Sequence, residues 1–202
     1  MEFEMKNMRE LKHFLEIQVQ RDQEHRQIHI DQSEYINTIL EKYDLADYNL
    51  ITTSIATGTR LRKSTPDDNN LMKDSKEYQS IIESQMYAIL YTKPDLAYAI
   101  SQVSQFSNLS NTSHYAIAKH VLRYLKEILH VDIIFSESLR LVLELYCDAD
   151  WANGEDRKSI SAYIAILTDG VIIWKAKKQS TIATSSIDVE YITLLQTIKK
   201  SL

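Results

Sequence analysis

Residues 141–174 have the sequence LVLELYCDADWANGEDRKSISAYIAILTDGVIIW, and this stretch decides the fold class. Apolar residues dominate 141–146, 161–167 and 171–174, in runs of strand length that are rich in branched and aromatic side chains. Thr168-Asp169-Gly170 separates the last two runs and is a signal for a hairpin turn. The stretch therefore predicts three antiparallel strands, and the second and third of them form a hairpin.

A helix is predicted to follow these strands, from Ser185-Ser186 to the last residue. Apolar residues recur along it at helical spacing and define an apolar side. One helix on three strands can bury one face of the sheet, and we expect the opposite face and one edge to stay uncovered. The apolar side consists of Ile187, Tyr191, Leu194, Leu195 and Ile198.

The chain before these strands is predicted to be mainly helical. Apolar spacing indicates helices that begin at Ser33 and Glu77 and a third over about 114–129. Pro94 suits the first turn of a further helix. Residues 49–76 are polar and irregular, which predicts a linker or long loop.

Short strands are also expected outside the three-stranded unit. Residues 11–20 and 28–30 could pair as a hairpin, and 133–135 has the composition of another strand. Strands and helices in this order give the α+β class.

Composition restricts the function. The 202 residues carry a net charge of -5, which argues mildly against tight nucleic-acid binding and leaves room for a local basic patch. Cys147 is the only cysteine, so a disulfide framework and a cysteine zinc site are excluded; a reducing intracellular location is expected, with cytoplasm and nucleus not distinguished. No apolar run approaches ~18 residues, so no membrane span is expected.

Asp148 and Asp150 end an apolar strand and should point to the same side of it. Asp188 and Glu190 lie in the first turns of the last helix. Two or more carboxylates can hold Mg²⁺ for phosphodiester hydrolysis. Aspartates are equally favoured in turns, and acids at a helix N-terminus, so spacing alone leaves both interpretations open.

Basic residues cluster beside the two tryptophans. Arg157 and Lys158 follow Trp151, and Lys177 and Lys178 follow Trp174. These side chains could contact phosphates, or they could form an ordinary solvated surface.

Several motifs in this order resemble the reverse transcriptase and ribonuclease H of Ty1/copia-type retrotransposon Pol polyproteins, over nearly the whole chain. The most specific matches are at the C-terminal end. The matching segments are Phe3–Lys6, Glu10–Lys12, Phe14-Leu15, Gln32 with Tyr35 and Ile39-Leu40, Met86-Tyr87, Thr92–Asp95, Tyr98-Ala99, Leu122–Lys126, Asp148–Ala152, Asp156–Ser159, Lys177–Gln179, Ser185-Ser186 and Glu190-Tyr191.

The resemblance implies a two-metal ribonuclease H that uses Mg²⁺ to cleave the RNA strand of an RNA–DNA hybrid. It assigns Asp148 as the metal ligand of the first strand and Glu190 as the catalytic carboxylate of the helix, and it makes Asp188 peripheral. Arg157, Lys158, Lys177 and Lys178 become the candidate nucleic-acid-binding residues. The resemblance gives no oligomeric state.

The resemblance also suggests a division of the chain. Residues 1–48 are similar to the end of the palm and the start of the thumb, 49–76 to a linker, 77–130 to a helical connection and 131–202 to a truncated, incomplete ribonuclease H-like domain. The polymerase aspartates are expected before residue 1, and a further ribonuclease H aspartate after residue 202. The nuclease site within the chain is therefore expected to be incomplete.

Three functions remain open from the sequence. The first is a catalytically inactive retrotransposon remnant that keeps nucleic-acid-binding surfaces, and its binding of Mg²⁺ is doubtful. The second is a ribonuclease H subunit completed by another chain. The third is a non-enzymatic interaction module that keeps only the helical part.

Glycine is scarce, with three residues where an average composition of about 7% would give roughly fourteen. We hypothesise that guanine-to-adenine changes in a decayed gene copy replaced several glycines. An acid at a position that needs positive φ should destabilise the fold by about 1 kcal/mol or more. The family usually has glycine at Arg9, Glu16, Glu83, Glu127, Asp132, Ala162 and Asp169.

Overall fold

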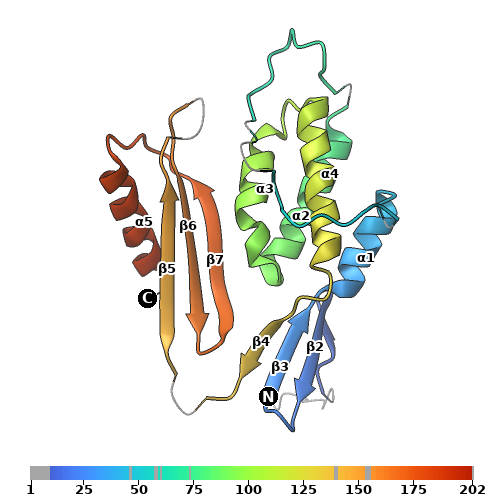
Figure 1. The fold of residues 1–202 in the computed structure, drawn as a ribbon, viewed down its shortest axis with the longest axis vertical. Coiled ribbons are helices and arrows are strands. Elements are labelled where there is room, and N and C mark those ends of the chain that lie inside the picture. Colours follow the sequence, from blue (N-terminus) through green and yellow to red (C-terminus); the bar gives the residue numbers. More distant parts are fainter. Residues whose placement is uncertain are drawn as a thin grey trace, which may run out of the picture.

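The computed structural model describes residues 10–45, 47–56, 59, 61–72, 74–138, 141–152 and 156–201. The Phe3–Lys6 match and Arg9 lie outside these residues. The described part contains five α-helices, two 3-10 helices and two antiparallel sheets, so the predicted α+β class is confirmed (Figure 1). In chain order the elements are β1 His13–Phe14, β2 Ile17–Asp22, β3 Gln27–Asp31, α1 Ser33–Lys42, α2 Lys76–Tyr91, η1 Pro94–Leu96, α3 Ala97–Val103, η2 Ser104–Phe106, α4 Thr112–Glu127, β4 Ile133–Ser136, β5 Leu143–Asp150, β6 Ile160–Leu167, β7 Gly170–Lys178 and α5 Ser186–Ser201.

The first sheet has the strand order β1-β2-β3-β4. The predicted hairpin near the N-terminus is confirmed, because Val19 of β2 pairs with Ile30 of β3. Strand β4 joins this sheet, where Ile133 pairs with Ile30, and it does not extend the later sheet. Two segments about a hundred residues apart therefore close one sheet, a pairing that alternation within either segment cannot reveal.

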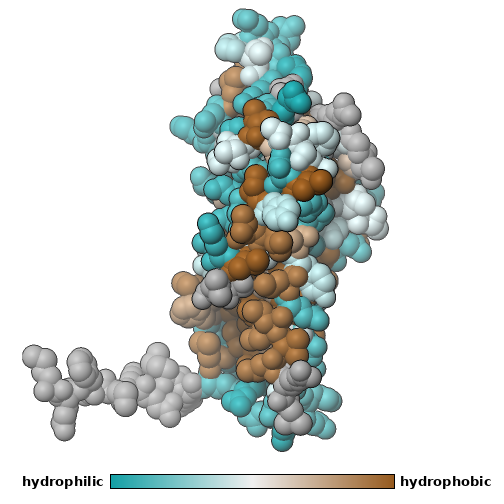
Figure 2. All heavy atoms as spheres, turned by 90° about the vertical axis from the view of Figure 1, so that its left-hand side faces the viewer, coloured by the Kyte–Doolittle hydropathy of each residue, from teal (hydrophilic) through white to brown (hydrophobic). Residues whose placement is uncertain are grey.

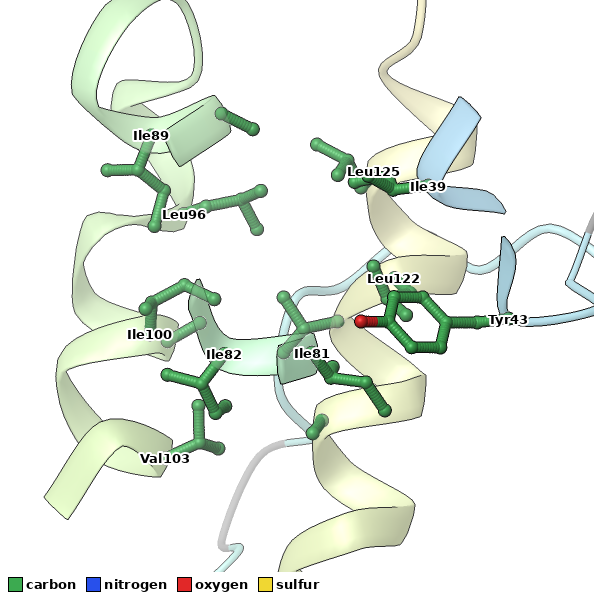
Figure 3. Close-up of a cluster of buried hydrophobic side chains, with 14 of the residues drawn as sticks. Ile39, Tyr43, Ile81, Ile82, Ile89, Leu96, Ile100, Val103, Leu122 and Leu125 are labelled. Atoms are coloured by element: carbon green, nitrogen blue, oxygen red, sulfur yellow. The ribbon is translucent and has the colours of Figure 1, made fainter. Parts of the chain in front are cut away.

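The helices α1 to α4 enclose the main hydrophobic core (Figure 3). The apolar positions that predicted each helix are largely the ones that are buried, as expected for amphipathic helices around one core. Fully or nearly fully buried members include Ile36, Ile39, Leu40, Ile81, Ile82, Leu96, Ile100, Val103, Leu122 and Leu125.

Residues of the family-like motifs fix the chain around this core. Thr92 donates a hydrogen bond to the buried side chain of Gln32 at 2.8 Å. Pro94 begins η1, as predicted. On α4, Arg123 donates to the carbonyl of Asn49 at 2.9 and 3.0 Å. These contacts give Gln32, Thr92 and Arg123 a structural role around the helical core.

The second sheet has the order β5-β6-β7, and Thr168-Asp169 makes the predicted hairpin turn between β6 and β7. Helix α5 packs against one face, over β5 and β6. The other face lies toward the helical core, as Figure 1 shows. There the indole nitrogen of Trp174 donates to the carbonyl of Ile89 at 2.8 Å.

The apolar side predicted for α5 does not pack on the sheet. Val189, Thr193 and Thr197 are the buried residues of α5, and the Thr193 hydroxyl hydrogen-bonds that of Ser161 on β6 at 2.7 Å. Tyr191 and Leu195 lie two positions from Thr193 in either direction, which places them on the opposite side of the helix. The expectation that this stripe covers the sheet is therefore wrong, since its five residues are 42–67% exposed.

One of the described glycine-replacement positions has a left-handed backbone conformation. Glu16 has φ 58°, whereas Glu83 lies in the interior of α2 and Asp169 does not have positive φ. In the hairpin turn it is Thr168 that has positive φ, at 61°. Positive φ, the condition for the expected loss of stability, is thus met at Glu16 and not at the other described replacement positions.

Glu16→Gly and Glu83→Gly are expected to change stability in opposite directions. Glu16→Gly relieves a left-handed residue and should raise the free energy of unfolding by about 1 kcal/mol. Glu83→Gly loosens an exposed helix position and should lower it by about 1 kcal/mol. Urea unfolding of both variants measures the difference, and shifts of the same sign would contradict the backbone assignment.

Candidate functional site

Strand β5 carries the aspartates of the candidate site on one face. Asp148 pairs with Ala162 and Asp150 with Ile160 of β6, so both side chains point to the same side, as predicted. Ala149, between them, pairs with Ser161, the residue that bonds Thr193 of α5. Asp148 and Asp150 therefore point to the face that is turned away from α5.

A pocket of about 250 Å³ lies beside Asp148, between this face and the start of α3. The hydroxyl of Tyr98 donates to Asp150 at 3.3 Å, and this contact connects the helical part to the end of β5. The lining is mostly aromatic and aliphatic, with few polar groups to orient a ligand. Lining residues include Pro94, Tyr98, Tyr146, Asp148, Ile164 and Trp174.

The acids of α5 have different surroundings. Asp188 accepts hydrogen bonds from the Thr184 hydroxyl and the Ser185 backbone N–H, while its own N–H donates to the Ser185 hydroxyl. The Thr184 bond, followed by the Ser185 bonds, lowers the pKa of the Asp188 carboxyl. Such a reciprocal cap stabilises the start of a helix. Glu190 is exposed, one turn before Thr193.

The structure does not combine Asp148 and Glu190 into a metal cage. The strand end and the helix start lie at the same end of the sheet (Figure 1), but Asp148 points to the face that is turned away from α5, the helix that carries Glu190. Within the described part of the chain, no group of three His, Cys, Asp or Glu side chains could hold a metal ion. Two-metal hydrolysis needs several convergent carboxylates, so this donor set does not fit the pair of Mg²⁺ ions, and no catalytic step follows from it.

The basic residues gather at one end of the second sheet. Arg157 and Lys158 precede β6, and Lys177 and Lys178 end β7, which runs antiparallel to β6. The backbone N–H of Gln179 donates to the Ser159 carbonyl at 2.8 Å, which joins the two segments. The basic residues that form two clusters in the sequence therefore form a single cluster in space.

Lys178 differs from the other three basic residues. Its ammonium lies 2.9 Å from Asp156 and donates to Gln105 at 2.8 Å. Burial opposes ionisation of Asp156, but this ammonium and the Lys158 backbone N–H keep the pKa of its carboxyl below the usual value. Lys178 thus connects the sheet to η2. Among the described ion pairs, none involves Arg157, Lys158 or Lys177.

Sequence reasoning missed the polar contact beneath α5. Gln179 donates to the Ser161 hydroxyl at 2.8 Å, and Ser161 bonds Thr193. All three side chains are buried. The only available signal was the regular spacing of Val189, Thr193 and Thr197, which a search for large apolar residues overlooks.

No described helix has the length and apolar character that crossing a membrane requires. No protein-family model matches the chain. No solved structure matches it either.

Curated relatives cover almost the whole chain. The retrovirus-related Pol polyprotein from transposon TNT 1-94 of Nicotiana tabacum is 30% identical over 98% of this chain. That from transposon RE1 of Arabidopsis thaliana is 31% identical over 96% of it. The chain spans 15% and 13% of these two relatives. An uncharacterized mitochondrial protein of Arabidopsis thaliana is 28% identical, with 96% of this chain and 79% of the relative covered.

The order of the motifs along the chain and the matches to these relatives, which cover almost the whole chain, point to the same family. The chain belongs to the retrovirus-related Pol polyproteins of Ty1/copia-type transposons.

Proposed function

We propose that this region of a Ty1/copia Pol polyprotein binds nucleic acid without cleaving it. In this proposal β5, β6, β7 and α5 are the ribonuclease H-like part, and the preceding helices are the connection to the polymerase. The observation that carries the proposal is a contrast within one sheet. The basic residues converge at one end of the sheet, whereas Asp148 points to the face that is turned away from α5, the helix that carries Glu190.

Arg157, Lys158 and Lys177 are the proposed phosphate contacts. Arg157 and Lys177 are exposed, Lys158 is half-buried, and no described ion pair involves their side chains. Lys178 is left out because Asp156 and Gln105 already engage its ammonium. Phosphate contacts fix position and carry no sequence information, so we expect binding with little sequence preference.

Removing the three charges is expected to weaken binding of an RNA–DNA hybrid at least tenfold at low salt. The test compares Arg157→Gln/Lys158→Gln/Lys177→Gln with wild type by fluorescence anisotropy in EDTA. Each lost phosphate contact should also make the plot of log affinity against log salt concentration less steep. The slope should decrease in magnitude by about one per contact.

The matched control is Lys12→Gln/Arg21→Gln/Lys76→Gln, which removes the same charge at exposed positions elsewhere. It should change affinity less than twofold. Equal losses in both triple variants would show that only net charge matters. No measurable binding by wild type would contradict the proposal outright.

A further inference from the structure

Residues 61–72 form an irregular segment that lies against the N-terminus of α4 (Figure 1). We call this segment the strap. The backbone N–H of Met72 donates to the Ser110 carbonyl at 3.1 Å, and that of Thr112 donates to the Asn70 carbonyl at 3.0 Å. The strap is therefore attached to the residues at which α4 begins.

His114, in the first turn of α4, joins the strap to the cap of this helix. The Asn111 side chain accepts from the backbone N–H of His114 at 2.9 Å, and Nδ1 of His114 accepts from the backbone N–H of Asn111 at 3.2 Å. Nε2 of His114 donates to the Arg62 carbonyl at 3.0 Å. The imidazole stacks on the Phe106 ring with 4.1 Å between centroids, and His114 is 1% exposed. One buried ring thus serves both the helix cap and the strap.

These partners are compatible only with the neutral imidazole of His114. A backbone N–H can only donate and a carbonyl oxygen can only accept, so Nδ1 must carry the lone pair and Nε2 the proton. A proton on Nδ1 would point toward the Asn111 N–H and leave both buried donors without an acceptor. Protonation therefore breaks the reciprocal bond that caps α4.

The charge that acts on the His114 ring is that of Arg62, and it disfavours the protonated form. The Arg62 guanidinium is paired with Asp68 at 3.0 Å. On α2, Glu77 is engaged by the hydroxyl of Tyr115, and η2 contributes an aromatic ring and no charged residue. Burial lowers the pKa of His114 from 6.5; the bond to the Arg62 carbonyl opposes this shift, and the Arg62 charge adds to it.

Residues 49–53 are attached to α4 in a different way. Arg123 donates to the Asn49 carbonyl at 2.9 and 3.0 Å, and His120 donates to the Thr53 carbonyl at 2.9 Å. Both side chains act as donors, and a protonated side chain still donates. Acid therefore removes neither of these contacts.

We propose that His114 is an acid-sensitive latch: a proton taken up from water by Nδ1 breaks the capping bond with Asn111 and releases the strap, while residues 49–53 stay attached to α4. A released ring titrates near 6.5. Between its lowered pKa in the closed state and 6.5, opening takes up a proton, so opening becomes more favourable as the pH falls through this window. This proposal does not depend on nucleic-acid binding.

Hydrogen exchange of the full chain, followed by NMR, measures the opening of the strap. The Met72 and Thr112 amides bond across the boundary between the strap and α4. Their protection factors, corrected for the intrinsic exchange rate at each pH, should fall about fivefold or more between pH 7 and pH 5. At pH 5 they should also be at least tenfold lower than the protection factor of Leu122, in the interior of α4, because the strap opens while the helix remains folded.

His114→Gln removes the titration and keeps the cap. Glutamine at the third helical position is a usual partner in a capping box, since it can accept from the Asn111 N–H without taking up a proton. The protection factors of Met72 and Thr112 should then change less than twofold between pH 7 and pH 5. His120→Gln is the matched control and should keep the pH dependence of the wild type.

Three results would overturn the proposal. Wild-type protection factors of Met72 and Thr112 that do not change with pH would remove the proton-linked opening. The same pH dependence in His114→Gln as in the wild type would assign the effect to another group. Equal protection of Met72, Thr112 and Leu122 at pH 5 would show that the strap opens only when the whole chain unfolds.

An NMR titration of the wild type decides the matter even if His114→Gln does not fold. The Cε1–H resonance of His114 should titrate with a midpoint below 6.5, and the backbone amide of Asn111 should shift with the same midpoint. A midpoint above 6.5, or an Asn111 amide that does not follow the ring, would contradict the latch.

Discussion

Replacing Lys93 by methionine is expected to lower the free energy of unfolding by about 3 kcal/mol. Lys93 is 1% exposed, and its ammonium donates to the carbonyl oxygens of Ile128 and Val131, both at 2.7 Å. These carbonyls follow the end of α4, where the helix dipole favours a cation. Methionine fills the same space but leaves both acceptors buried without their donor.

The control for Lys93→Met is Lys76→Met, at an exposed position at the start of α2. It should change stability by less than about 0.5 kcal/mol. Urea unfolding monitored by circular dichroism gives both values. Similar small losses in the two variants would contradict a structural role for the buried ammonium.

The loss of stability caused by Lys93→Met should also depend on pH. Burial lowers the pKa of Lys93 from 10.5, although Asp95 and Asp132 oppose this shift. Between the lowered pKa and 10.5 the unfolded chain binds more protons than the folded chain, so stability rises with pH. Methionine lacks this contribution. The stability difference between wild type and Lys93→Met should therefore be constant below the lowered pKa and widen as the pH rises from there to 10.5.

Gly170→Ala is the second large expected loss, about 2 kcal/mol. A Cβ built on Gly170 would overlap the ring of Phe135 in β4. The same turn sits where the first sheet meets the second, since β4 and β7 are in contact. A ring held in a sheet cannot move aside as a flexible chain end can, so the two sheets must separate locally.

Two further variants isolate this clash. Asp169→Ala, at the exposed neighbouring position, should change stability by less than about 0.5 kcal/mol. Phe135→Leu combined with Gly170→Ala should be less harmful than the sum of the separate effects, because the smaller side chain makes room. Strict additivity in thermal unfolding would contradict the contact.

Much of the fold could be predicted because its signals are local. The helix start at Ser33, the role of Pro94 at η1 and the hairpin at Thr168-Asp169 depend on spacing and turn chemistry within a few residues. Strands β3 and β4 were both predicted as strands, but their pairing with each other was not. Pairing across about a hundred residues depends on the whole fold.

The orientation of α5 shows what periodicity leaves open. Its apolar stripe was evident, but a period of 3.6 does not say which side meets the sheet. The Ser161–Thr193 hydrogen bond and the small residues beneath the helix place the threonine side inward. The stripe is therefore exposed, on the face of the molecule that Figure 2 shows, which reverses the expected arrangement.

The sequence predicted which residues form the candidate site, but it did not predict how their side chains are arranged. Strand alternation correctly predicted that Asp148 and Asp150 point to one face of the sheet. The local sequence does not indicate that α5 covers the other face. The basic cluster likewise included Lys178, and only the structure shows its ammonium held between Asp156 and Gln105.

In the proposed function, the candidate carboxylates of this chain do not converge on a metal. The direct test of this claim is cleavage of an end-labelled RNA–DNA hybrid by the full chain with excess Mg²⁺, compared with Asp148→Asn and Glu190→Gln. We predict that wild type releases no more product than either variant. Mg²⁺-dependent cleavage by wild type that both substitutions abolish, and that Glu24→Gln retains, would contradict the account.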